Sequence, residues 1–194
     1  APVTLTYRVY GREMSVRTNW IESSFALING APTFMAMVAD LARPHEVVFE
    51  LPDSWSAAAT ALVPLPAERQ AFRADDFDTL IDSPVLLGNP VQREFVAGGR
   101  RHVMAFEGDT SFFDVDRVTA DTRKIVEAGA RIMGDRYDYP FYYGLTLVVD
   151  AGGGLEHANS FLVMAHRFAM RTRRSYLAYH SLVAHEVFHV WNIT

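Results

Sequence analysis

The first half of the chain is predicted to be rich in β structure, because short runs of alternating apolar and polar residues recur along it. From residue 3 to residue 9 every second side chain is apolar, which is typical of a strand with one buried face. Similar runs follow at residues 15–18, 24–28, 46–51, 61–65, 93–97 and 101–106. The Gly98-Gly99 pair is the best hairpin signal, because glycine reaches positive φ without a steric cost. Repeated short strands separated by turn residues favour a β-sandwich-like sheet domain.

The hydrophobic pattern changes to a helical period after Gly108. Apolar residues recur between residues 114 and 133, Asp114 or Asp116 can cap the start of a helix, and Gly134 can end it. Two apolar runs at residues 141–149 and 160–166 then predict strands, and residues 175–192 predict a final helix. We therefore expect an α+β fold with an amino-terminal β domain over residues 1–110 and a second domain over residues 111–194.

Composition excludes some classes of partner and ligand. The chain has 194 residues, 49% of them hydrophobic, which is enough for a core, and its formal net charge is −5. An acidic surface does not attract nucleic acid or an anionic membrane, so we expect neither as a partner. The absence of cysteine removes disulfides and thiolate ligands, so histidine and carboxylate must carry any metal chemistry. We favour a periplasmic or extracytoplasmic location over a cytoplasmic one.

The predicted final helix contains the pattern HExxH at His185, Glu186 and His189. Residues four apart lie on one face of a helix, so both imidazoles can hold one ion, and zinc is the natural cofactor. Glu186 then lies beside the metal, where its carboxylate can take a proton from water. A zinc peptidase is the favoured interpretation. The alternative is a core cluster whose polar groups are satisfied by internal hydrogen bonds.

The same helix resembles that of a known family. Trp191 and Asn192 follow the second histidine, and the run from residue 185 to residue 192 resembles the zinc helix of the glycyl aminopeptidase family of metallopeptidases. Residues 152–160 are similar to the family's glycine-rich substrate strand, and residues 77–88 to the segment that leads into its catalytic part. These matches occur in order along the chain, so the resemblance covers all of it.

The resemblance implies a gluzincin, with an amino-terminal β domain followed by the first half of a thermolysin-like catalytic domain. It places the third zinc ligand, a glutamate, on a later helix beyond Thr194, together with a tyrosine that stabilises the oxyanion and a PDZ domain. We therefore expect residues 1–194 to be a fragment of a larger peptidase, and we expect this fragment to bind zinc weakly and to have little activity alone. The full-length protein is expected to continue into the rest of the catalytic domain.

The resemblance also implies a substrate-binding role for the glycine-rich strand. Glu156 would pair with the free α-ammonium group of a peptide substrate, while Gly153 and Gly154 would let the two backbones approach closely. His157 and Asn159 would orient the substrate or hold Glu156. The alternative is a glycine-rich turn with an exposed glutamate.

These observations predict a zinc-dependent aminopeptidase that hydrolyses the amino-terminal peptide bond of its substrate. Glu186 is the expected catalytic base, and Trp191 is expected to be a packing residue. Two other functions remain open, namely a zinc endopeptidase with the same chemistry and a protein-interaction module with a vestigial metal site.

Overall fold

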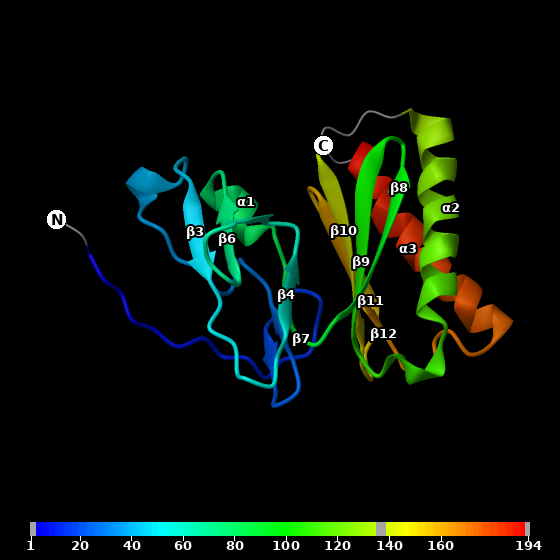
Figure 1. Cartoon of the computed structure of the whole chain (residues 1–194), viewed down its shortest axis with the longest axis horizontal. Helices are drawn as coiled ribbons and strands as arrows, with labels where there is room; N and C mark the ends of the chain where they lie inside the picture. The colour runs from blue at the N-terminus through cyan, green and yellow to red at the C-terminus, as the bar shows by residue number, and fades with distance from the viewer. Residues whose placement is uncertain (1–2, 135–138, 193–194) are drawn as a thin grey trace.

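The computed structural model describes residues 3–134 and 139–192, which form a sheet-rich α+β structure. The amino-terminal part holds two small antiparallel sheets (Figure 1). The first sheet has the strand order β1 (Trp20–Ile21), β2 (Ala26–Ile28), β7 (Val85–Gly88) and β4 (Ala57–Thr60). The second has the order β3 (His45–Val48), β6 (Ala71–Ala74) and β5 (Val63–Pro64). The 3₁₀ turn η1 (Val38–Asp40) and the short helix α1 (Phe77–Ile81) complete this part.

A five-stranded sheet follows, and it carries the rest of the fold. Its strand order is β11 (Gly153–His157), β12 (Ser160–Ala165), β10 (Phe141–Val148), β9 (Arg100–Gly108) and β8 (Val91–Ala97). The three central strands are parallel, and the edge strands β8 and β11 are antiparallel to their neighbours. The 3₁₀ turn η2 (Thr110–Phe112) leads from β9 into α2 (Val115–Met133), and α3 (Arg173–Asn192) follows β12.

The five-stranded sheet is covered on both faces, which explains why its central strands are almost continuously apolar. Helices α2 and α3 pack on one face, where Met104, Phe161 and Val163 meet Val126 and Val183 in one core cluster (Figure 1). The alternate residues of the same strands point to the amino-terminal part. There Ala105, Leu145, Leu147, Leu162 and Met164 pack against Val16, Phe25, Leu27, Ala59 and Leu86. The two parts therefore share a core.

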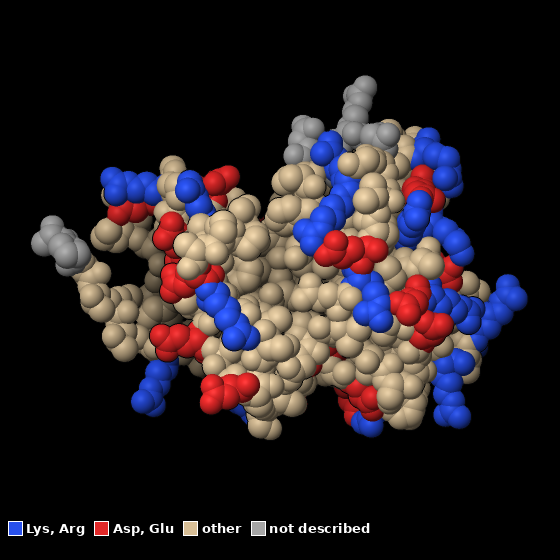
Figure 2. Space-filling view, in the orientation of Figure 1, with Lys and Arg blue, Asp and Glu red and all other residues tan. Residues whose placement is uncertain are grey.

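The surface agrees with this shared core. Figure 2 shows acidic and basic side chains mixed over both parts, whereas uncharged residues occupy most of the region where the two parts meet on this face. Among the residues that the structure describes, no helix combines the length and the apolar character needed to cross a bilayer.

The strongest local signals in the sequence are confirmed. The Asp114 carboxylate accepts a hydrogen bond from the Arg117 backbone N–H at 3.0 Å and caps α2, and Gly134 ends the helix with φ 87°. The glycine pair at 98–99 has positive φ and connects β8 and β9 as an antiparallel hairpin. The runs at residues 24–28, 46–51, 93–97 and 101–106 each overlap a strand.

Two predicted strands are wrong. Residues 3–9 form no strand, and their apolar side chains are largely exposed, with Val3 at 79% and Leu5 at 63% of full exposure. Residues 15–18 form a turn that is closed by hydrogen bonds between Ser15 and Thr18. Alternation alone does not make a strand when no neighbouring strand satisfies the backbone.

The sheet topology bears on the expected division of the chain at residue 110. Strands β8 and β9, which were assigned to the amino-terminal domain, belong to the same sheet as β10 and β12. The amino-terminal sheets end with β7 at Gly88. We therefore propose a division near residue 90, because a boundary at 110 would assign strands of one sheet to two domains.

Candidate active site

The HExxH residues lie on α3, as the helical pattern predicted. His185 and His189 are one turn apart, and their Nε2 atoms approach to 3.2 Å with the two rings perpendicular. His185 is exposed and His189 is half-buried, whereas Glu186 is 3% exposed. The pair of imidazoles is thus partly open to solvent, whereas the Glu186 carboxylate is enclosed.

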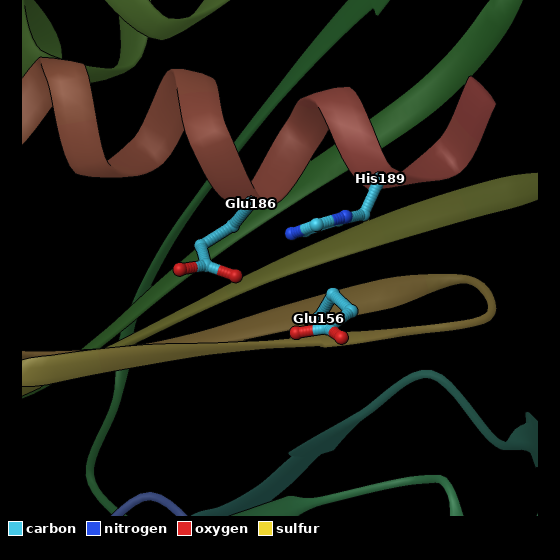
Figure 3. Close-up of side chains that lie close together, drawn as sticks. All are labelled: Glu156, Glu186 and His189. Carbon is cyan, nitrogen blue, oxygen red and sulfur yellow. The ribbon is translucent and has the colours of Figure 1, made fainter. Parts of the chain in front are cut away.

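The glycine-rich strand brings a second carboxylate to this helix. Glu156 on β11 lies opposite α3, and Glu186 and His189 point toward the hairpin that carries it (Figure 3). One ligand atom from each of these three residues lies within 4.8 Å of the other two. A strand residue and two helix residues that are distant from it in the sequence therefore form one cluster of potential metal ligands.

Gly154 explains how Glu186 fits beside the strand. A β-carbon at Gly154 would lie 2.6 Å from Glu186 Cδ and would also overlap Oε1. The residues of a strand alternate between faces, so Gly154 and Glu156 face α3, whereas Leu155 joins the core cluster on the side of the amino-terminal part. Gly153 has φ 142°, a conformation that side chains disfavour. Glycine is therefore required at the two positions for different reasons: at Gly154 by the space that Glu186 fills, and at Gly153 by the backbone conformation.

Burial sets the electrostatics of the cluster. It raises the pKa of Glu186, and the negative charge of Glu156 acts in the same direction, whereas positive charge on His185 or His189 would lower that pKa. Within the described residues, Glu186 Oε2 and His189 Nδ1 are buried without a hydrogen-bond partner. These unpaired atoms argue against a cluster satisfied by internal hydrogen bonds.

His157 and Asn159 both contact the amino-terminal part of the chain. His157 Nδ1 lies 2.9 Å from Asp82 Oδ1, and the Ala158 backbone N–H donates to Asp82 Oδ2 at 2.7 Å. Asn159 Nδ2 donates to the Ala61 carbonyl at 3.2 Å. Both side chains therefore attach the β11–β12 turn to the amino-terminal part. Sequence reasoning missed Asp82, although it lies within the stretch 77–88 that the resemblance singled out.

A cleft of about 510 Å³ separates β11 from the amino-terminal part. Leu155, Glu156 and His157 line one wall, and residues on and beside α1 line the other, among them Ile81 and Asp82. Glu156 therefore borders both the cleft and the cluster on α3. This position allows a bound molecule in the cleft to contact Glu156.

Trp191 has a packing role, as expected. Its indole N–H donates to the Gly134 carbonyl at 2.9 Å, and its ring lies over Gly129 of α2. The residue holds the end of α3 against α2 rather than facing Glu156.

Comparisons with known proteins agree with the peptidase interpretation. Residues 1–89 match the family model described as the Peptidase M61 N-terminal domain. The whole fold is similar to a crystal structure of an aminopeptidase N family protein from Idiomarina loihiensis, with 31% sequence identity and a TM-score of 0.87. That match covers 96% of this chain and 33% of the other, so the chain spans about a third of the length of that protein. No curated protein matches the chain. Together the family model and the solved structure support a relationship to metallopeptidases and a peptidase-related function.

Proposed function

We propose that this chain is the amino-terminal portion of a zinc-dependent aminopeptidase of the glycyl aminopeptidase type. The observation that carries the proposal is the pair of facing Nε2 atoms on His185 and His189, 3.2 Å apart and next to the buried carboxylate of Glu186. The match to a peptidase domain and the similarity to an aminopeptidase N family structure support it.

The donor atoms fit zinc. Zinc–nitrogen bonds of about 2.05 Å at a tetrahedral angle bring two ligand nitrogens to roughly 3.3 Å from each other. His185 and His189 meet that requirement within about 0.1 Å. The two histidines would hold the ion, and the resemblance implies a third ligand, a glutamate, from a later helix outside residues 1–194. Glu156 is the rival third ligand, because one of its atoms lies within 4.8 Å of His189.

The residues of this chain then have distinct tasks. A bound zinc ion would supply positive charge that activates water and polarises the scissile carbonyl. The Glu186 carboxylate takes a proton from the attacking water and passes it to the leaving amine nitrogen, and the raised pKa of this residue suits a group that must both accept and release a proton. Glu156 pairs with the α-ammonium group of the substrate and so directs cleavage to the first peptide bond.

The decisive experiment compares Glu186→Gln with the wild-type full-length protein. We expect the variant to retain zinc, because both histidines remain, and to lose at least about a hundredfold in kcat, because the proton acceptor is gone. Glu13→Gln, at an exposed position, is the matched control and should keep its activity. Full turnover by Glu186→Gln would contradict the proposal. The proposal would also be contradicted if neither the wild type nor Glu186→Gln cleaved peptides and both bound a protein partner equally well.

A second assay separates an aminopeptidase from an endopeptidase. Acetylation of the amino terminus removes the positive charge that Glu156 is proposed to bind, so an acetylated peptide should not be cleaved. Cleavage of free and acetylated peptides at equal rates would favour an endopeptidase. Glu156→Gln should weaken the preference for the free amino terminus.

A further inference from the structure

The carboxylate of Asp82 joins the amino-terminal part to the hairpin that carries Glu156. Its Oδ1 lies 2.9 Å from His157 Nδ1, and its Oδ2 accepts from the Ala158 N–H at 2.7 Å. A carboxylate only accepts hydrogen bonds, so His157 donates through Nδ1. Asp82 is itself fixed, because its backbone N–H caps α1 by donating to the carbonyls of Asp78 and Leu80. Both ends of this connection are therefore held by regular structure.

The register of β11 against β12 sets the direction in which Glu156 points. His157 pairs with Ser160 and Glu156 with Phe161 in the β11–β12 register, and only residues 158 and 159 lie in the turn. Since His157 faces the amino-terminal part, the adjacent Glu156 must face α3. A shift of one residue would exchange these two directions and remove the carboxylate from the cluster. The bond from Asn159 Nδ2 to the Ala61 carbonyl adds a third attachment of the same turn.

We infer that Asp82 is a positioning residue for substrate binding: it fixes the β11–β12 turn and thereby holds Glu156 where it meets the amino terminus of the substrate. The inference rests on the proposed function, because it assigns a purpose to the position of Glu156. It also gives the amino-terminal part a share in substrate binding through a residue on the wall of the cleft.

Two substitutions at Asp82 distinguish the loss of its hydrogen bonds to the turn, here called the anchor, from a general loss of stability. Asp82→Ala removes both acceptor oxygens. Asp82→Asn keeps one oxygen for the Ala158 N–H, and its amide nitrogen can donate to His157 Nδ1 if the imidazole changes tautomer. The conservative variant should therefore rescue most of what alanine loses. Asp75→Ala, in the same segment but highly exposed, is the matched control for the loss of one negative charge.

The first measurement is hydrogen exchange of the Ala158 amide in the zinc-loaded full-length protein, followed by mass spectrometry of peptides that span the turn. We expect exchange about tenfold faster in Asp82→Ala and close to wild type in Asp82→Asn and Asp75→Ala. Unchanged exchange in Asp82→Ala would overturn the inference. If Asp82→Ala does not fold, the steady-state kinetics of Asp82→Asn are compared with those of Asp82→Asn/His157→Phe, and this comparison decides the question. The double variant removes the remaining bond between the side chains of residues 82 and 157.

The second measurement is steady-state cleavage of a peptide with a free amino terminus. Asp82→Ala should raise KM about tenfold and change kcat less than about threefold. Combined with Glu156→Gln, it should add almost nothing to the KM of Glu156→Gln alone, because the group that it positions is already altered. Additive effects, or faster exchange with an unchanged KM, would refute the positioning role. A wild-type protein that cleaves no peptide would instead refute the proposed function and the substrate role with it, while the exchange rates would still report the anchor.

Discussion

The carboxylate of Glu186 occupies the space that a side chain at Gly154 would need. A β-carbon there would lie 2.6 Å from Glu186 Cδ, so the Glu186 side chain can keep this position only if residue 154 is glycine. The catalytic base that we propose is therefore positioned by the absence of a side chain on the opposite strand.

Gly154→Ala should impair catalysis more than stability. The clash falls on the end of a flexible side chain, so Glu186 can turn away at small cost to the fold but then leaves its position beside the histidines. We expect kcat to fall about a hundredfold, with zinc content and melting temperature near wild type. Gly152→Ala is the control, because its β-carbon would meet nothing within 4 Å. Equal kcat values for the two variants would show that Glu186 needs no such space.

Loss of either histidine should remove the metal. His185→Ala and His189→Ala each delete one of two facing Nε2 donors, and we expect zinc content to fall below about a tenth of the wild-type value. His166→Ala is the control, since that exposed imidazole pairs with Asp150 at 3.0 Å. Elemental analysis of the purified full-length proteins makes the measurement.

The same assay identifies the third ligand. If a glutamate outside residues 1–194 completes the site, Glu156→Gln should retain its zinc. Zinc loss in this variant as large as in His189→Ala would assign Glu156 to the metal and away from the substrate.

Glu107 predicts a pH dependence of stability outside the active site. It is 7% exposed near the end of β9, and in the described part of the chain its Oε2 is buried without a partner. Burial raises the pKa of Glu107 above the ordinary value of 4.5. Its neutral form thus favours folding, and this contribution is complete below the unfolded pKa and is lost as the pH rises through the folded pKa.

Glu107→Gln, which cannot ionise, should therefore stabilise the protein at pH 8 by about 1 kcal/mol and have little effect at pH 4. Thermal melting at the two pH values makes the comparison. Glu94→Gln is the control, and its effect on stability at pH 8 should have the opposite sign, because a hydrogen bond from Arg101 lowers the pKa of Glu94. A destabilised Glu107→Gln at pH 8 would mean that the buried carboxylate is ionised and paired.

Gly129→Ala should destabilise the protein even though alanine favours helices by about 1 kcal/mol over glycine. The new β-carbon would lie 2.6 Å from Trp191 Cη2, and the indole cannot easily move because its N–H is bonded to the Gly134 carbonyl. We expect a net loss of about 1 to 3 kcal/mol in unfolding experiments. The smaller ring of Trp191→Phe should recover part of that loss in the double variant. If Gly129→Ala were more stable than the wild type, the helix propensity of alanine would outweigh the crowding against Trp191.

Elements with local signals were predictable from the sequence. The capped helix α2 and the glycine hairpin between β8 and β9 depend on residues close together in the chain, and the pattern of α3 lies within twenty residues. Residues 3–9 show the limit of such patterns. They alternate as a strand does, yet a strand also requires a partner backbone, which no alternation encodes.

Relationships between distant residues were not predictable. Neither the sequence of β8 nor that of β9 states which sheet it joins, since both sheets accept alternating or apolar strands. The same is true of Asp82, which lies 75 residues from His157 and shows no motif of its own. The contacts of His157 and Asn159 with the amino-terminal part were not predictable either, because the face of a short strand depends on a register that only the folded structure fixes.

The shared core has a consequence for engineering. Leu145 and Leu162 have no exposed surface, and they share one core cluster with Leu27 and Leu86 of the amino-terminal part. A protein produced without residues 1–89 would present that bare aliphatic face to water, and we expect it to aggregate. For the same reason, a chimera that borrows its first 89 residues from a relative should be active only if the borrowed surface matches this face side chain by side chain.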